Sequence, residues 1–245
     1  MFEQWLAGLE RRHLAELRVP EVTRALRALS SAYVQRRHKV ASGSTLDSAG
    51  KRAAFALFYG PLHFIAVSHV VDALGAGDPP PASILDIGCG TGVAGAAWAS
   101  SAGRASAVTG IDRHPWAVDE ARRTYTDLGI RGYARVGDVA RLPPLEARDA
   151  VIAAYVLNEL APATRAKVED HLLAAAARGA RVLIVEPIAR RVTPWWNETA
   201  ARILALRGRS DEWRIPVDLP PMLRLFDKAA GLNHRELTMR TLYIG

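Results

Sequence analysis

The chain of 245 residues is long enough for one α/β domain with a substantial core and a smaller extension; 49% of its residues are apolar and 23% charged, as in an ordinary globular protein. Its net charge of +7 is concentrated in residues 1–52, which carry ten basic and five acidic side chains. The single cysteine excludes an internal disulfide, a cysteine-ligated zinc site and an iron–sulfur cluster, and it fits the cytoplasmic location that we expect.

The first third of the chain has the pattern of a helical domain. Apolar side chains recur at helical spacing in 5–17 and again in 22–33. A small polar loop at 41–50 offers Asp47 or Ser48 as the N-cap of a further helix. We therefore expect several helices before any strand.

The most apolar segment, 53–74, raises the question of a membrane span. It contains His63, His69 and Asp72, and polar side chains at this density are costly in lipid. The N-terminal residues also lack a basic start followed by an apolar run, so no secretory signal is visible. The segment predicts a pair of buried helices, and we expect no membrane partner.

After a proline-rich linker at 75–83 the pattern changes to alternating strands and helices. Strands are predicted at 83–88, 107–112, 132–137, 149–155, 180–186 and 234–244, and helices at 92–102, 115–128, 162–178, 194–206 and 220–230. Strands alternating with helices indicate a parallel sheet with right-handed crossovers. We expect an α/β fold with a doubly wound, mostly parallel sheet at 79–245 and a helical N-terminal domain at 1–78.

The turn after the first predicted strand contains two overlapping glycine motifs. Counted from Asp86 it reads D-x-G-x-G-x-G, and from Gly90 to Gly95 it reads G-x-G-x-x-G. In a dinucleotide site the charge of Asp86 would oppose the diphosphate and Gly88 would have no role. A phosphate-binding P-loop is excluded because no Gly-Lys-Ser/Thr follows. An adenosyl cofactor without a diphosphate uses every element of the motif.

Acidic residues end the first three predicted strands, where ligands bind in doubly wound sheets. Asp86 can face a cationic amino group or an ordered water, Asp112 can accept from both ribose hydroxyls, and Asp138 from the adenine amino group. The predicted cofactor-binding residues are Asp86, Gly88, Cys89, Gly90, Gly92, Asp112, Arg113, Asp138, Val139 and Tyr155.

The segments ILDIGCGTG, GID, GDVARLP, DAVIAAYVLNEL and RVLIVEP follow one another through residues 83–190. In this order and spacing they resemble a class I S-adenosylmethionine-dependent methyltransferase. The resemblance implies a Rossmann-like fold, S-adenosylmethionine as cofactor and S-adenosylhomocysteine as product. Transfer from a sulfonium is an in-line displacement, so we expect no metal.

Four residues at the ends of the fourth and fifth strands are candidates for catalysis: Tyr155, Asn158, Glu159 and Glu186. A buried Glu159 or Glu186 with a raised pKa can act as a base, whereas Asn158 or Glu159 can equally cap the following helix. The sequence after the fourth strand lacks the Pro-Pro-aromatic motif of enzymes that methylate exocyclic base amines. Pyrimidine C5 chemistry is excluded because the lone Cys89 lies in the glycine turn.

Candidate substrate-binding residues are Arg36, Arg37, His63, Trp195 and Trp196. A basic N-terminal region suggests a polyanionic partner, and exposed surface arginines are the alternative. The two tryptophans can stack a nucleic-acid base or cover the edge of the sheet. His63 can reach the site from the N-terminal helices or be a packed core histidine.

A narrower resemblance concerns the mitochondrial small-subunit ribosomal methyltransferase-like family and its bacterial relatives. Its pattern is matched at Pro61, Ala66, Tyr155, Leu157, Glu159, Leu160, Glu186 and Pro187. The family's cysteine cluster is absent, and Ile188-Ala189-Arg190 replaces the usual Gly-Thr-Pro. The resemblance implies ribosomal RNA as acceptor and RNA or a ribosomal subunit as partner.

Three functions stay open. The first is an RNA methyltransferase, with ribosomal RNA as the expected acceptor and residues 1–75 gripping the polyanion. The second is a small-molecule N- or O-methyltransferase in which those residues form a lid. The third is a ribosome-assembly factor that binds the cofactor with little turnover.

Overall fold

The computed structural model describes residues 1–35, 46–141 and 149–245. Its N-terminal helices are α1 (Phe2–His13), α2 (Val19–Gln35), α4 (Ala49–Ala54) and α5 (Gly60–Leu74), with a π-helical turn, η2 (Phe55–Tyr59), between the last two. The predicted cap is confirmed at Ser48, whose side chain accepts a hydrogen bond from the Lys51 N–H.

α4, η2 and α5 form one continuous helix where a helix pair was expected. Pro61 lacks an N–H and would interrupt a regular α-helix. The π turn before it, in which the Gly60 N–H donates to the Phe55 carbonyl five residues back, lets the helix continue. Within the described residues this is the one helix long and apolar enough to cross a membrane, but 67% of its most apolar window is buried inside the protein. It is a core helix.

A seven-stranded sheet follows, in the order β3-β2-β1-β4-β5-β7-β6. The strands are β1 (Ser83–Ile87), β2 (Ala107–Asp112), β3 (Gly132–Val136), β4 (Asp149–Ala154), β5 (Arg181–Glu186), β6 (Arg209–Pro216) and β7 (Glu236–Ile244). β1 to β5 are parallel, and β7 runs antiparallel to both β5 and β6. The predicted mostly parallel sheet is confirmed, but β6 was not predicted, because this edge strand is largely exposed and lacks an apolar signal.

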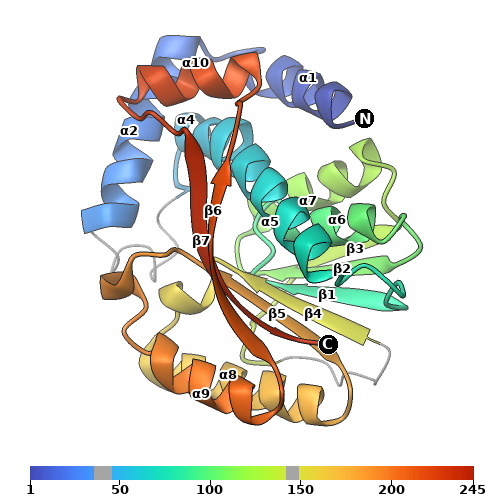
Figure 1. The fold of residues 1–245 in the computed structure, drawn as a ribbon. Helices are drawn as coiled ribbons and strands as arrows, with labels where there is room; N and C mark the ends of the chain where they lie inside the picture. Colours follow the sequence, from blue (N-terminus) through green and yellow to red (C-terminus); the bar gives the residue numbers. More distant parts are fainter. Residues whose placement is uncertain (36–45, 142–148) are drawn as a thin grey trace.

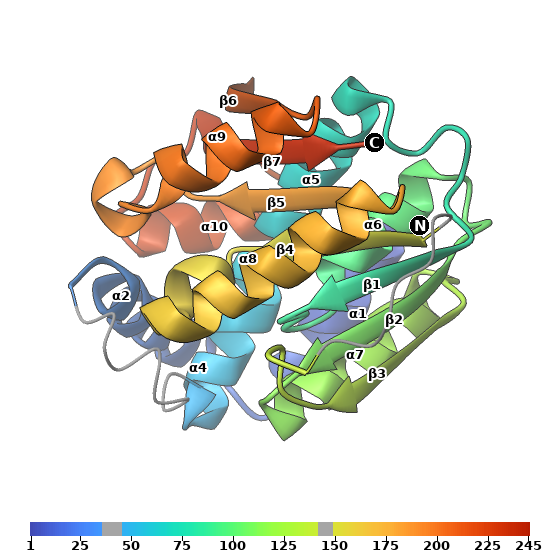
Figure 2. The ribbon, with the colours of Figure 1, turned by 90° about the horizontal axis from the view of Figure 1, so that it is seen from below.

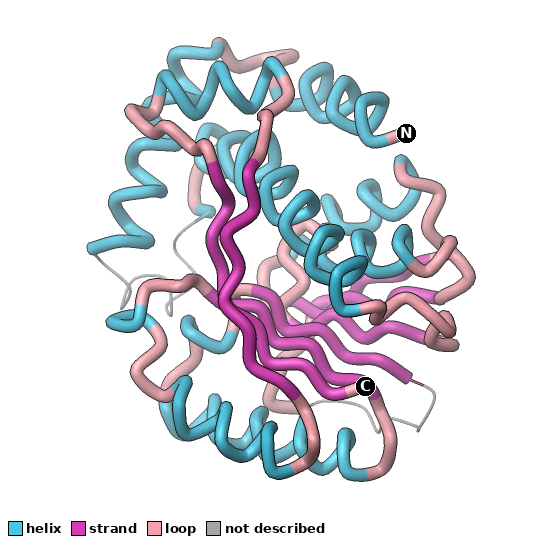
Figure 3. Tube along the Cα trace, in the orientation of Figure 1, coloured by secondary structure: helices cyan, strands magenta, loops and turns pink. Residues whose placement is uncertain are grey.

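Helices cover both faces of the sheet (Figures 1 and 2). The helices after α5 are α6 (Val93–Ser101), α7 (Pro115–Asp127), α8 (Pro162–Ala177) and α9 (Trp196–Ala205), with 3-10 turns η3 (Leu157–Glu159) and η4 (Arg190–Val192). A further helix, α10 (Pro221–Ala229), lies beside α2 and η2. α5, α6 and α7 lie on one face and α8 and α9 on the other. The β6–β7 hairpin rises beyond the other strands towards α10 (Figure 3).

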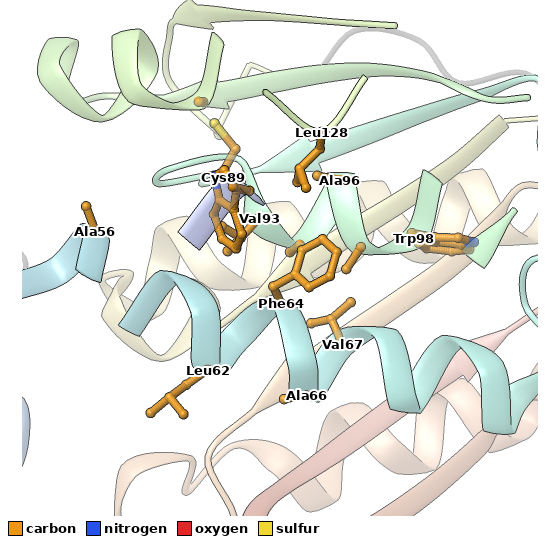
Figure 4. Packing of buried hydrophobic residues seen from close by; sticks show 14 of the residues in the cluster. Ala56, Leu62, Phe64, Ala66, Val67, Cys89, Val93, Ala96, Trp98 and Leu128 are labelled. Carbon is orange, nitrogen blue, oxygen red and sulfur yellow. The ribbon is translucent and has the colours of Figure 1, made fainter. Parts of the chain in front are cut away.

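The N-terminal helices share their core with the sheet. One buried cluster joins Trp5 of α1 and Leu57 of η2 to Trp98 of α6. Phe64 and Val67 of α5 pack towards α6 in the same cluster (Figure 4). The helical N-terminal extension is therefore part of one packed body, and the boundary at 78/79 stays a prediction.

A buried carboxylate holds α1 against α7. Glu120 is 0% exposed and accepts hydrogen bonds from Arg12 Nη2 at 2.9 Å and from His13 Nε2 at 3.2 Å. Arg12 also donates to Asp127 at 2.8 Å. Burial alone would raise the pKa of Glu120, but the hydrogen bonds and charges of His13 and Arg12 outweigh burial and lower this pKa to about 2.

Replacing Glu120 with Gln should lower the free energy of unfolding by about 2 kcal/mol, because Arg12 and His13 lose a charged acceptor. The contribution of Glu120 should be complete above its unfolded pKa of 4.5 and disappear as the pH falls towards 2. Urea unfolding at several pH values measures both effects. Asp119→Asn, which changes a pair exposed on the same helix, should cost less than about 0.5 kcal/mol. An equal cost for the two variants would contradict this account.

Candidate active site

The glycine turn between β1 and α6 has a backbone that only glycine adopts easily. Gly88, Gly90 and Gly92 have φ angles of 65°, 52° and 77°. A Cβ on Gly88 would lie 2.2 Å from Val156 Cγ2, and one on Gly92 would lie 2.8 Å from Tyr125 Cε1. The protein's own packing therefore requires these glycines, in addition to any approach of a ligand.

Carboxylates at the strand ends hold this turn in place. Asp86 Oδ2 accepts from the Gly95 N–H at 2.8 Å, and Asp112 Oδ2 accepts from the Gly90 N–H at 2.9 Å. Asp138, after β3, accepts from the Ala140 N–H at 2.9 Å. Each carboxylate oxygen has two lone pairs, so these acids can still accept hydrogen bonds from a ligand.

A cavity of about 900 Å³ opens where β1, β2 and β4 end. Of the predicted cofactor-binding residues, the lining includes Asp86, Gly88, Cys89, Gly90, Asp112, Arg113, Asp138, Val139 and Tyr155. Gly92 is not part of the lining and instead lets α6 pack against α7. The opposite wall comes from η2 and α5 and from the start of β7. The structure thus brings the predicted strand-end acids to one cavity.

Two stacked rings form a flat wall of the cavity after β4. Tyr155 has a φ of 58°, and the His63 ring lies parallel to it at 4.0 Å between centroids, with 19° between their planes. Burial lowers the pKa of His63 to about 4, so its imidazole is neutral at pH 7. Burial and the nearby charge of Glu186 raise the pKa of Tyr155, so its hydroxyl keeps its proton. His63 reaches the site, as one of the two predictions had it.

The expectation that Glu186 acts as a base is corrected by its environment. Glu186 is 0% exposed and is not part of the cavity lining, whereas Asn158 and Glu159 are. Its Oε1 accepts from the Asn158 backbone N–H at 3.1 Å, and its Oε2 accepts from the Asn158 side-chain amide. Burial raises the pKa of Glu186 to about 8, opposed by the hydrogen bonds from Asn158. Glu186 therefore orients Asn158.

The alternative prediction, that Asn158 or Glu159 caps the helix after β4, is wrong. The N-cap of α8 is Ala161, and no side-chain hydrogen bond caps this helix. Neither Asn158 nor Glu159 caps α8, and both line the cavity.

The two tryptophans are placed in the core and not at the cavity. Trp195 and Trp196 are 7% and 5% exposed and belong to the buried cluster on the α8–α9 face of the sheet. The guanidinium of Arg165 lies 5.1 Å from the Trp195 ring centroid, and that of Arg240 lies 5.0 Å from the Trp196 centroid. The structure supports the prediction that Trp195 and Trp196 cover the sheet. Their burial leaves no open ring face for stacking on a nucleic-acid base, so that alternative is corrected. Arg36 and Arg37 lie outside the described residues.

Some residues of the site were not predicted. Gly95 belonged to the competing dinucleotide motif, yet its N–H is what anchors Asp86. His114 lines the cavity and donates its backbone N–H to Asp112 at 2.8 Å. Phe55 and His234 also line the cavity. Gly95 carried a sequence signal, the spacing of its motif, and His114 follows the predicted Asp112 by two residues. Phe55 and His234 carried no signal, because they come from distant elements that meet in the folded chain.

The collision at Gly88 gives a direct test of the turn. Gly88→Ala should destabilise the protein by about 1 kcal/mol for its positive φ and by roughly 1–3 kcal/mol more for the contact with Val156. Gly75 is the matched control: its φ is 63°, but a Cβ there meets nothing within 4 Å. Gly75→Ala should show the first cost only, measured by urea unfolding. Equal losses in the two variants would contradict the packing role of Gly88.

Comparison with known proteins identifies the sheet domain. Residues 84–180 match a family model described as "Methyltransferase domain". No curated protein matched the sequence.

Three solved structures illustrate the structural likeness. The mitomycin 7-O-methyltransferase MmcR has 16% identity and a TM-score of 0.55, over 98% of this chain and 71% of that chain. Magnesium protoporphyrin IX methyltransferase from Synechocystis PCC 6803, with bound SAH, has 17% identity and a TM-score of 0.51, over 74% and 82%. A TehB-like SAM-dependent methyltransferase from Corynebacterium glutamicum has 21% identity and a TM-score of 0.47, over 73% and 87%.

At these identities the first two structures establish the shared fold, and the family model adds a match to residues 84–180. The narrower resemblance to the mitochondrial ribosomal family stays a prediction. With its glycine turn held by strand-end acids, this chain therefore carries a region, residues 84–180, that matches a methyltransferase domain, in a fold that it shares with solved methyltransferases.

Proposed function

We propose that the chain transfers a methyl group from S-adenosylmethionine to a hydroxyl or amine of a small, largely apolar molecule. The observation that carries this proposal is the wall of the cavity opposite the glycine turn. Its apolar lining comes from the continuous N-terminal helix and from β7: Phe55, Phe58, Leu62, Ala66, Leu237 and Met239. An apolar pocket with a few polar groups is typical of small-molecule sites.

The residues on the turn side fit the cofactor. Three carboxylates at the cavity disfavour a diphosphate but suit a ribose and a cationic amino acid. The Thr91 hydroxyl lines the cavity, is buried and has no hydrogen-bond partner in the described part of the chain, so it is available to the cofactor's amino-acid end. The cofactor, when bound, supplies an electrophilic methyl group on its sulfonium.

The size of the cavity limits the acceptor. About 900 Å³ must hold both the cofactor and the acceptor, and sites for small ligands span roughly 300–1,000 Å³. The volume that the cofactor leaves free suits a molecule of one or two aromatic rings. The flat wall formed by His63 and Tyr155 would orient such a ring by stacking.

The chain's own residues can manage the single proton that is released. Asn158, held by Glu186, presents an amide to the cavity and can position the acceptor. Glu159 is the carboxylate on the same wall and is our candidate to accept the proton. The His63 imidazole, with its lowered pKa, is a poor base.

The basic N-terminal region gives less support to an RNA acceptor. Arg12 pairs with Glu120 and Asp127, and the Arg27 guanidinium donates to the Ala229 carbonyl. These cations serve contacts within the protein. The match with the mitomycin 7-O-methyltransferase, named for a small-molecule acceptor, extends over 98% of this chain. RNA methylation and ribosome assembly stay predictions.

Radiolabelled S-adenosylmethionine incubated with a fractionated lysate tests the acceptor class. We expect label in compounds that resist ribonuclease and protease, with little change between 50 and 500 mM salt. Glu159→Gln should lower kcat by about 100-fold or more, with unchanged cofactor affinity. Glu198→Gln, at an exposed position on α9, is the control. Label that is sensitive to ribonuclease, with transfer falling steeply as salt rises, would contradict the proposal and favour RNA.

Asp86 predicts a pH dependence of cofactor binding. Burial raises its pKa to about 7, the charge of Asp112 adds to this, and the Gly95 hydrogen bond opposes it. The cationic cofactor favours the ionised carboxylate, so its affinity should rise up to about tenfold between pH 6 and 8.

Isothermal titration calorimetry of the wild type and Asp86→Asn measures this effect, and the variant should lose the rise. In the protein without cofactor, the free energy of unfolding changes with pH in the opposite direction to the cofactor affinity. The stabilisation that comes from the raised pKa of Asp86 is complete below pH 3.8 and is lost as the pH rises through about 7. The same pH dependence in wild type and variant would contradict the role of Asp86.

A further inference from the structure

A histidine–aspartate pair lies at the outer end of the cavity. His234, in the segment between α10 and β7, lines the cavity, and its ring centroid is 6.2 Å from that of Phe58. Asp227 of α10 is 5% exposed and contacts His234 at two points. Its Oδ2 accepts from the His234 backbone N–H at 2.9 Å, and its Oδ1 is hydrogen-bonded to Nδ1.

This double contact fixes the orientation and the tautomer of the imidazole. A carboxylate only accepts hydrogen bonds, so the Nδ1 of His234 carries the proton that Asp227 receives. The Nε2 atom is then the ring nitrogen left for the cavity. Among the residues that the structure describes, Nε2 has no hydrogen-bond partner, and 34% of the side chain is exposed.

The surroundings of His234 are mostly apolar. Phe58, Leu232 and Leu237 line the same end of the cavity. Two further polar side chains there, Ser30 and Tyr59, are hydrogen-bonded to each other. His234 is thus a polar side chain, already oriented by Asp227, in an apolar part of the cavity wall. Small-molecule sites commonly use a few such polar groups to fix the orientation of a ligand.

The position of His234 separates it from the reacting centre. In the register of the sheet, Arg240 of β7 lies beside Glu186, the last residue of β5. The β7 residues before Arg240 continue past that end, so Glu236 lies roughly 14 Å further along the hairpin at about 3.4 Å per residue. Tyr155, in contrast, directly follows β4. The pair therefore faces the part of an acceptor that is remote from the transferred methyl group.

We propose that the His234–Asp227 pair binds a hydroxyl group at the end of the acceptor opposite the methylated atom. A hydroxyl suits Nε2 in both protonation states, because it donates to the neutral nitrogen and accepts from its N–H when the ring is charged. A methyl ether or a hydrocarbon edge cannot donate and would leave the neutral Nε2 unpaired. The inference rests on the proposed small-molecule function and adds a specificity determinant to it.

Binding of two naphthols to the protein saturated with S-adenosylhomocysteine tests the pair without requiring methyl transfer. 2-Naphthol has one hydroxyl, and 2,6-dihydroxynaphthalene has one at each end of the same flat ring system. In calorimetry the diol should bind the wild type about tenfold more tightly, the effect of one hydrogen bond to an oriented imidazole. In His234→Phe the two compounds should bind alike.

Two further variants complete the experiment. His69→Phe changes an exposed histidine that is not part of the cavity lining, and it should keep the tenfold advantage. Asp227→Asn should reduce the advantage severalfold, because the imidazole loses its charged partner. Unchanged affinity for S-adenosylhomocysteine shows that each variant is folded.

Three results would overturn the proposal: no binding of the diol, equal affinities in the wild type, or an advantage that persists in His234→Phe. Failure of the proposed function is distinguishable, because it would appear as label in RNA while the diol kept its advantage in binding.

Discussion

Two hydrogen bonds from backbone N–H groups to strand-end carboxylates are the constraint on which the site depends. Asp86 binds the Gly95 N–H at the start of α6, and Asp112 binds the Gly90 N–H in the turn. Together they fix a glycine-rich turn, and such a turn is costly to order because glycine loses the most conformational freedom on folding. The same carboxylates then face the cavity, so one set of groups shapes the turn and supplies the charge that a cationic nucleoside needs.

The second constraint is the continuous helix from α4 to α5. Its buried side packs on α6 and shares a core with the sheet, and its π-helical turn contributes Phe55, Phe58 and Tyr59 to the cavity wall. π-helical turns are frequent at functional sites. The N-terminal helices thus both pack against the sheet domain and form one wall of the cavity, and Glu120 ties α1 to the same body.

The sequence predicted what depends on local pattern. The parallel strands and the acids at their ends follow from apolar runs and from residue spacing, and the structure brings these acids together. What depends on tertiary contacts was missed or misjudged. β6 is an exposed edge strand without an apolar signal, Glu186 is buried behind Asn158, and His234 reaches the cavity from the far end of the chain. Contacts between residues so far apart in the chain cannot be predicted from the spacing of residues in the sequence.

A crystal structure with S-adenosylhomocysteine is the most direct measurement of the central claim. We predict the ribose hydroxyls within hydrogen-bond distance of Asp112 and the amino-acid end beside the glycine turn, with the space between Tyr155 and the N-terminal helix left for the acceptor. Density for the nucleoside at any other place, or a turn that releases Asp112 from Gly90 and leaves the cavity empty at saturating ligand, would contradict it.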